Sequence, residues 1–208
     1  PIGRWNISAV TTMKNMFRDA SAFNQDISPN YDGNTWGWLT TNVKDMTNMF
    51  YFAQAFNNGQ TNNEGTAPLY WSFSNVTNMS RMFHSATVFN QDIGNWNTSE
   101  VTDMTELFYG AQAFNQDIGN WDTSKVTTMY QMLYAAYVFN KDIRYWNVSS
   151  STNLSSMFLN AQPAFSAAYN GSIGWGTTPS STFFNQFSDN GVTYYFTEDS
   201  NNDVTITS

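Results

Sequence analysis

Cysteine is absent from this chain of 208 residues, and histidine occurs only once, as His84. Without cysteine the chain has no disulfide bond, no thiolate nucleophile and no cysteine-ligated metal site. A single histidine makes a poor metal site by itself. The sequence also lacks a phosphate-binding glycine motif and a serine nucleophile in a recognisable elbow. We therefore expect that the protein is not an enzyme and that it binds no cofactor and no metal.

Charged residues are scarce as well, at 12% of the chain, and 16 acidic side chains outnumber 8 basic ones to give a net charge of −8. Nucleic-acid phosphates are bound by clustered lysine and arginine, and no such cluster is visible. The acidity disfavours anionic membrane surfaces, and no apolar run is long enough to span a bilayer. We expect no nucleic-acid partner and no membrane insertion by this chain.

Aromatic residues, in contrast, are abundant, and their spacing indicates an internal repeat. The basic period is 25 residues, and each of the first two repeats carries eight additional residues. These insertions lie between Ile27 and Trp38 and between Phe56 and Trp71. Valine, methionine, phenylalanine, alanine and isoleucine recur at fixed distances after each tryptophan. The six repeats begin at Trp5, Trp38, Trp71, Trp96, Trp121 and Trp146.

The fourth repeat illustrates the structure that we predict for each unit. Residues 104–111 carry apolar side chains at i, i+3, i+4 and i+7, the spacing of one helix face, and Thr102 precedes them as a candidate N-cap. Residues 114–118 indicate a short strand, followed by a turn at 119–120. A two-turn helix is unstable alone, so the units must stack to bury a shared core. We predict an α/β repeat solenoid of about six helix-turn-strand coils.

Two columns of the repeat carry polar or flat side chains. A buried asparagine that recurs at one position can satisfy backbone groups of neighbouring coils, so we interpret the asparagine column as a structural ladder. We interpret the column that contains His84 as an edge position that tolerates flat side chains. The first column comprises Asn24, Asn57, Asn90, Asn115 and Asn140, and the second comprises Arg18, Tyr51, His84, Tyr109, Tyr134 and Leu159.

The repeats run without a linker, so we predict one domain, with the solenoid over residues 1–165 and a capping segment over 166–208. Within the capping segment, residues 192–197 and 204–207 predict a β-hairpin around a polar turn. Such a hairpin would cover the open edge of the last coil. At the other end Ile2 matches the isoleucine of later repeats, so we expect a monomeric fragment of a longer repeat array.

The repeat pattern is most complete from Trp96 through Val101, Thr102 and Met104 to the sequence Phe-Asn-Gln-Asp-Ile at 114–118. This pattern resembles the bacterial surface-protein repeat of the BspA-like leucine-rich-repeat group, and the similarity covers about residues 1–165. The resemblance implies a leucine-rich-repeat-like stack, a secreted or cell-surface location and a role as an adhesin. It implies no catalytic residues.

An aspartate also recurs in most repeats. Recurring carboxylates could bind Ca²⁺ or act in pairs on glycosides. Active sites are seldom built from identical copies, however, and the sequence contains no calcium-loop motif. We favour solvated carboxylates on a strand face, and we regard the acidic turn at 198–203 as a weaker candidate for Ca²⁺. The aspartate column comprises Asp26, Asp92, Asp117 and Asp142.

The two insertions are the clearest departures from the repeat. Trp36 and Leu69 stand where regular repeats have glycine, Tyr70 stands where they have asparagine, and Tyr31 lies in the first insertion. Loops on a rigid scaffold often carry binding residues, and aromatic rings beside polar groups suit a sugar ring. Alternatively, the aromatic rings pack the insertions onto the solenoid, and the sequence leaves both interpretations open. The candidate ligand-binding residues are Tyr31, Trp36 and Tyr70, with Gln25, Asp26, Gln91 and Asp92 beside them.

These features predict a non-catalytic extracellular recognition or adhesion module. It would bind a cell-surface glycan or a partner protein, for example of a host, through the strand face and the two insertions. A passive spacer in a larger surface adhesin is the alternative, and low exposure of Trp36 and Tyr70 would favour it. Ice binding is a further alternative, because a hydroxyl column comprises Ser8, Thr41, Ser74, Ser99, Ser124 and Ser149.

Overall fold

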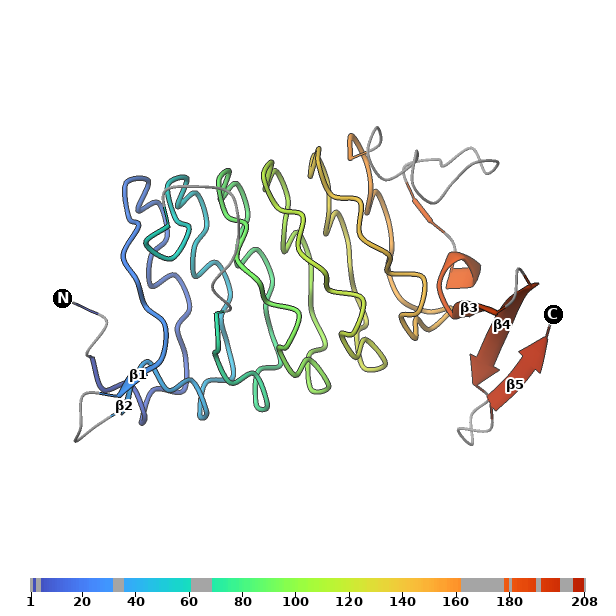
Figure 1. Cartoon of the computed structure of the whole chain (residues 1–208), viewed down its shortest axis with the longest axis horizontal. Coiled ribbons are helices and arrows are strands. Elements are labelled where there is room, and N and C mark those ends of the chain that lie inside the picture. The colour runs from blue at the N-terminus through green and yellow to red at the C-terminus, as the bar shows by residue number, and fades with distance from the viewer. Residues whose placement is uncertain are drawn as a thin grey trace.

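The structure is a computed structural model that describes residues 2, 5–31, 36–60, 69–161, 178–179, 181–189, 192–198 and 204–207. Each repeat forms one coil, so coil 1 begins at Trp5 and coil 6 at Trp146. The six coils follow one another along the long axis, and a small β-sheet lies at the C-terminal end (Figure 1). Successive coils are in register, because single-residue parallel bridges join equivalent positions. The bridged residues are Thr12, Asp45, Asn78, Asp103, Thr128 and Asn153.

The predicted helix-turn-strand coil is wrong. The described residues contain no α-helix, and the segment predicted as a helix in each repeat is a run of turns instead. Two short strands, β1 (Asn30–Tyr31) and β2 (Trp36–Gly37), lie in the first insertion. The remaining elements of the described chain are the 3-10 helix η2 (Ser181–Phe183) and three C-terminal strands. No helix of the described chain is long and apolar enough to cross a membrane.

The direction of the backbone hydrogen bonds explains why the coil is not a helix. In coil 2 the N–H groups of Met49, Tyr51 and Ala53 each donate to the carbonyl three residues earlier. The intervening N–H groups point out of the coil and donate to backbone carbonyls of the next coil. In an α-helix each N–H donates to the carbonyl four residues earlier. Because alternate N–H groups here donate to another coil, the segment cannot be an α-helix. They run from Met46 to Asn78, Asn48 to Ser80, Phe50 to Met82 and Phe52 to His84.

Left-handed backbone conformations shape the same segment. Every fourth residue has a positive φ, as at Asn48 (56°) and Phe52 (57°) in coil 2 and at Glu106 (51°) and Gly110 (64°) in coil 4. This conformation costs a non-glycine residue about 1–2 kcal/mol. The coil adopts it because it turns alternate N–H groups toward the neighbouring coil. The apolar spacing of a helix face therefore arises from consecutive turns that point the same residues inward.

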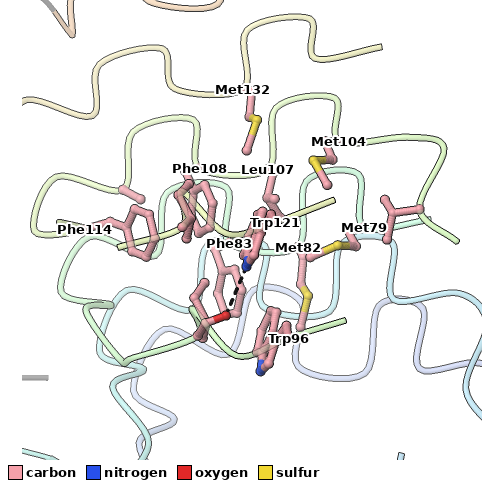
Figure 2. Close-up of a cluster of buried hydrophobic side chains, with 14 of the residues drawn as sticks. Met79, Met82, Phe83, Trp96, Met104, Leu107, Phe108, Phe114, Trp121 and Met132 are labelled. Carbon is pink, nitrogen blue, oxygen red and sulfur yellow. Dashed lines mark hydrogen bonds between the residues drawn. The ribbon is translucent and has the colours of Figure 1, made fainter. Parts of the chain in front are cut away.

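The core consists of aromatic columns that run along the stack. Phe83 stacks on Phe50 at 5.5 Å and on Phe108 at 5.8 Å, measured between ring centroids. Trp96 lies 6.3 Å from both Trp71 and Trp121, with ring planes within 5° of parallel. Methionine side chains fill the space beside the rings (Figure 2). Each coil thus buries its apolar side chains against the equivalent residues of its neighbours.

The tryptophans that begin coils 2 to 6 also have a polar contact that repeats along the stack. The indole N–H donates to the carbonyl of the isoleucine column of an earlier coil, as from Trp121 to Ile93 at 3.1 Å (Figure 2). A buried indole N–H needs such a partner. The other pairs are Trp38 to Ile2, Trp71 to Ile27, Trp96 to Leu69 and Trp146 to Ile118.

The structural ladder predicted for the asparagine column is confirmed. The side-chain oxygen of each asparagine accepts the backbone N–H of the next asparagine in the column, at 2.8–3.0 Å. Asn90 also accepts the side-chain amide of Gln116 at 3.0 Å. The column therefore satisfies one backbone N–H group of each following coil.

The predicted β-hairpin is present and gains a third strand. Strand β4 (Val192–Glu198) pairs antiparallel with β5 (Val204–Thr207) and with β3 (Gln186–Asp189). The segment before the sheet contacts the last coil, because Phe184 stacks on Trp146 at 6.1 Å and Asn185 donates its N–H to the Trp146 carbonyl at 3.0 Å. Phe184 thereby ends the tryptophan column. The part of the predicted cap at 166–177 lies outside the described residues.

Candidate binding site beside the second insertion

Tyr70 is the most exposed aromatic residue among the predicted site residues that the structure describes, at 65% exposure. It lies between two buried residues, Leu69 and Trp71. Its sequence distance from Trp71 predicted that Leu69 takes the turn position of the glycines, and this prediction is wrong. Leu69 fills the isoleucine column, where its carbonyl accepts the indole N–H of Trp96 at 2.7 Å. The buried neighbours anchor Tyr70 and leave its ring on the surface.

A hollow of about 190 Å³ opens beside Tyr70. Its apolar walls come from the tryptophan and isoleucine columns of coils 2 to 4, which are almost completely buried. Its polar groups are a hydroxyl, a carboxylate and an amide at the surface. The lining residues are Leu69, Tyr70, Trp71, Ser72, Asp92, Ile93, Asn95 and Trp96.

The polar groups of the hollow are only partly engaged. One carboxylate oxygen of Asp92 accepts the N–H of Gly94 at 3.0 Å, and no donor in the described chain reaches the other oxygen. The hydroxyl of Ser72 lies 3.2 Å from that of Ser74. Asn95 is exposed at the rim. The hollow therefore offers hydrogen-bond acceptors and donors around one exposed aromatic ring.

A glycine fixes the turn beneath this rim. A Cβ atom added to Gly94 would lie 2.5 Å from the carbonyl oxygen of Asp117 in the next coil. Because that atom belongs to the backbone, it cannot yield as a flexible side chain could. Gly94 thus holds the turn that carries Asp92 and Asn95 close against coil 4.

The structure brings together only part of the predicted site. Asp92 and Tyr70 line the same hollow. Gln25 and Asp26 are exposed on coil 1, and Asp26 accepts the N–H of Ser28 at 2.9 Å. The second insertion begins against this segment, since the Asn58 side chain accepts the N–H of Ile27 at 2.9 Å.

Two predicted residues of the first insertion have a described backbone only. Tyr31 on β1 and Trp36 on β2 are direct cross-strand partners. Their side chains lie outside what the structure describes, as do residues 32–35 and 61–68. In the first insertion β1 and β2 therefore form a two-stranded antiparallel ribbon. The role of Tyr31 and Trp36 in ligand binding stays a prediction.

Gln91 does not contribute to the surface. Its side chain is completely buried, and its amide donates to the Asn57 side chain at 2.9 Å. It therefore lies against the asparagine ladder. Its side-chain oxygen meets no donor in the described chain. Sequence analysis missed Ser72 and Asn95, although Asn95 occupies the same repeat position as Tyr70.

The aspartate column has a structural role in its turns. In each member one carboxylate oxygen accepts the N–H two residues later, as in Asp117 to Gly119 at 2.9 Å. Such a bond stabilises a tight turn. In Asp142 burial raises the pKa, but hydrogen bonds from Arg144 outweigh it and hold the pKa below its usual value. Within the described ranges no three His, Asp or Glu side chains gather to hold a metal ion, and residues 199–203 lie outside them.

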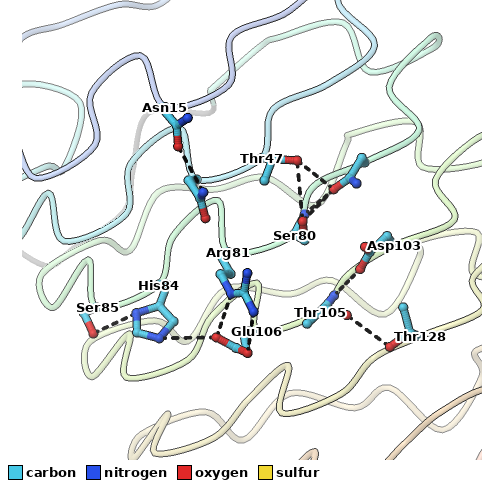
Figure 3. Close-up of polar contacts among 12 residues, drawn as sticks. Asn15, Thr47, Ser80, Arg81, His84, Ser85, Asp103, Thr105, Glu106 and Thr128 are labelled. Atoms are coloured by element: carbon cyan, nitrogen blue, oxygen red, sulfur yellow. Dashed lines mark hydrogen bonds and ion pairs between the residues drawn. The ribbon is translucent and has the colours of Figure 1, made fainter.

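The column of flat side chains around His84 forms a stack at the coil edge, as predicted. His84 lies 4.4 Å from Tyr109 and 4.6 Å from Tyr51, between ring centroids. Its ring nitrogens face Ser85 at 3.1 Å and Glu106 at 3.5 Å, and Arg81 binds Glu106 through two nitrogens (Figure 3). Burial lowers the pKa of His84 despite the opposing effect of Glu106. The cluster links neighbouring coils.

The hydroxyl column proposed for ice binding is engaged in local hydrogen bonds. Ser8 bonds to Asn6 at 2.7 Å, and Ser124 bonds to Asp122 at 2.6 Å. The residues that follow the column differ in chemistry from coil to coil, as with Glu100 and Lys125, which form an ion pair at 2.6 Å. These features give the surface little of the regularity that an ice lattice would require.

Comparison with known proteins yields a family and no named relative. No curated protein and no solved structure matches the chain. A family model described as "Mycoplasma protein of unknown function, DUF285" matches residues 1–67 and 60–171. The matched segments cover well over half of the chain and coincide with its six repeats. The chain belongs to the DUF285 family.

Proposed function

We propose that this chain is a non-catalytic recognition module of a secreted or surface-bound adhesin, and that it binds a sugar unit of a cell-surface glycan in the hollow beside Tyr70. One observation carries the proposal. An aromatic ring that is 65% exposed stands beside an open hollow with a carboxylate, an amide and a hydroxyl at its edge. This combination suits a sugar, whose apolar face stacks on the ring while its hydroxyls bond to the polar groups.

The architecture supports binding with little rearrangement. Tyr70 follows Leu69, whose N–H donates to the Asp92 carbonyl at 2.9 Å, so both sides of the hollow share one backbone contact. Ordering costs on binding are low when the site is preformed. A single sugar in so small a hollow would bind weakly, with a dissociation constant of about 1 mM. Many copies on a surface would raise the overall avidity.

The alternative functions fit these observations less well. Low exposure of Trp36 and Tyr70 would favour a passive spacer; Tyr70 is exposed, and the side chain of Trp36 lies outside the described residues. The resemblance to BspA-like surface repeats supports an adhesive role without specifying the ligand. A partner protein remains the alternative ligand, because an exposed tyrosine also suits a protein interface.

A glycan array tests the proposal with a matched pair of variants. Tyr145 precedes Trp146 as Tyr70 precedes Trp71, and it is 48% exposed, so Tyr145→Ala controls for loss of a surface tyrosine at the same repeat position. We expect specific glycan binding that Tyr70→Ala abolishes and Tyr145→Ala preserves. Arrays with Ca²⁺ and with EDTA should give the same result. Equal effects of both variants, or no glycan binding at all, would refute the proposed site.

A further inference from the structure

The turns that end coils 3 and 4 present the same polar groups, because Asp117 and Asn120 of coil 4 are equivalent to Asp92 and Asn95 of coil 3. One carboxylate oxygen of Asp117 accepts the N–H of Gly119 at 2.9 Å, and no donor in the described chain reaches the other. Asn95 and Asn120 are exposed, and neither side-chain amide has a partner among the described residues. The polar groups of the hollow are therefore repeated one coil further along the stack.

Close packing fixes the distance between these turns. A Cβ atom added to Gly119 would lie 2.6 Å from the backbone carbonyl oxygen of Asp142, so coil 4 approaches coil 5 as closely as Gly94 brings coil 3 to coil 4. Equivalent residues at the parallel bridges are roughly 4.8 Å apart. The rings of Trp96 and Trp121, which directly follow the two turns, are 6.3 Å apart between centroids. Consecutive turns are thus separated by about the length of one sugar unit in an extended chain.

The row of free polar groups has two defined ends. At one end stands the exposed ring of Tyr70. At the other end coil 5 has Arg144 at the position where coils 3 and 4 have glycine. The guanidinium of Arg144 donates to both carboxylate oxygens of Asp142, at 3.0 and 2.7 Å. The row therefore consists of one aromatic unit followed by two polar units.

The charge of the row selects among sugars. Among the described residues that line the hollow none is lysine or arginine, and Asp92 is the one charged group. Asp117 adds a second carboxylate in the next coil, on a chain whose net charge is −8. Ionised carboxylates accept strong hydrogen bonds from hydroxyl groups and repel other anions. The row therefore favours a neutral sugar over an acidic one.

We propose that the site beside Tyr70 extends along coils 3 and 4 and binds three units of a linear, neutral, β-1,4-linked oligosaccharide that follows the long axis of the stack. This inference rests on the sugar-binding function proposed above. The first unit stacks on Tyr70, the second bonds to the polar turn of coil 3, and the third bonds to the polar turn of coil 4. A β-1,4-linked chain is straight and can follow the coils, which succeed one another along one axis (Figure 1), whereas an α-1,4-linked chain curves away.

The dependence of affinity on chain length tests the proposal. The probes are β-1,4-linked oligomers of glucose and of N-acetylglucosamine, from one to five units, titrated into the whole chain and followed by NMR. We expect the affinity to rise up to three units and then to level off. The third unit should add roughly tenfold, the effect of one hydrogen bond to a charged acceptor. An α-1,4-linked glucose trimer and a β-1,4-linked glucuronic acid trimer should bind no better than one glucose unit.

A matched pair of variants locates the third unit. Asp117→Asn removes the charge and keeps an acceptor for the N–H of Gly119, so the turn is preserved. It should remove most of the gain from the third unit and leave the binding of a single unit unchanged. Asp122→Asn is the control, because Asp122 is also exposed and accepts a nearby N–H, that of Ser124 at 3.0 Å. This control should change no affinity.

The outcomes separate this inference from the function on which it rests. Equal affinities at every chain length, with binding still abolished by Tyr70→Ala, would overturn the extended row and leave the single-sugar site in place. Equal effects of Asp117→Asn and Asp122→Asn on the trimer would overturn it as well. Binding of another glycan on the array through Tyr70, with no binding of either oligomer series, would also overturn the extended row alone. No binding in either experiment would overturn both proposals.

Discussion

Replacing Asn90 with alanine removes one rung of the asparagine ladder and leaves the rest of the coil unchanged. Asn90 accepts the N–H of Asn115 at 2.9 Å and the side-chain amide of Gln116 at 3.0 Å. Gln116 keeps a partner, because it also donates to the Asn90 backbone carbonyl at 3.0 Å. The N–H of Asn115 loses its acceptor. An unsatisfied buried donor costs about 1–3 kcal/mol, so we expect a loss of about 2 kcal/mol.

Urea unfolding followed by tryptophan fluorescence measures this loss, and thermal unfolding should show a fall in Tm of roughly 4–8 °C for a chain of this length. Hydrogen exchange at residues 111–120 should accelerate most, because the ladder is interrupted there. Asn97→Ala is the control, since Asn97 is exposed and, within the described ranges, its side chain accepts only the nearby N–H of Ser99 at 3.2 Å. If both variants unfold at the same urea concentration, the ladder contributes nothing that a surface asparagine does not.

Two further changes test the packing between coils and the state of the histidine. Gly94→Ala should lower the free energy of unfolding by about 1–3 kcal/mol, because its Cβ would lie 2.5 Å from the Asp117 carbonyl oxygen. Asn95→Ala, at the adjacent exposed position, is the control in urea denaturation. Equal urea midpoints for the two variants would contradict the close approach of Gly94 to coil 4. Burial lowers the folded-state pKa of His84, so the unfolded chain binds the proton first as pH falls below about 6.5. The contribution of neutral His84 to the free energy of unfolding should therefore be fully present above about pH 6.5 and should be lost as the pH falls toward the folded-state pKa. His84→Tyr should make the free energy of unfolding less dependent on pH in urea titrations between about pH 7.5 and 5. An unchanged pH dependence in His84→Tyr would show that other groups cause it.

The register of the repeat was predictable from the sequence, because large side chains at one spacing must be buried together. Trp96 stacks between its counterparts, and Asn90 bonds to the next asparagine, as their columns indicate. The backbone conformation was not predictable. Consecutive turns place the same residues inward as a helix does, and no local signal reveals that the N–H of Phe50 donates to Met82 in another coil. Residues such as Phe52 have no intrinsic preference for a positive φ, which only the stack imposes.

The candidate site was predictable only in part. The exposure of Tyr70 follows from its turn position beside a break in the period. Leu69 was misplaced because counting back from Trp71 ignores how an insertion re-enters the core, whereas its apolar side chain belongs in the isoleucine column. Gln91 was misplaced because the predicted strand at this position is absent, and its side chain turns inward to Asn57.

The direction of the cross-coil hydrogen bonds also bears on mechanics. These bonds run along the long axis, so a pulling force between the two ends of the stack loads every coil interface in series (Figure 1). A coil of the regular repeat that peels away releases a 25-residue segment, roughly 85 Å of extended chain. A molecule held at both ends would therefore lengthen in discrete steps, and each step would dissipate energy before the next coil is loaded. Such stepwise yielding would let the stack act as a shock absorber between two anchored surfaces.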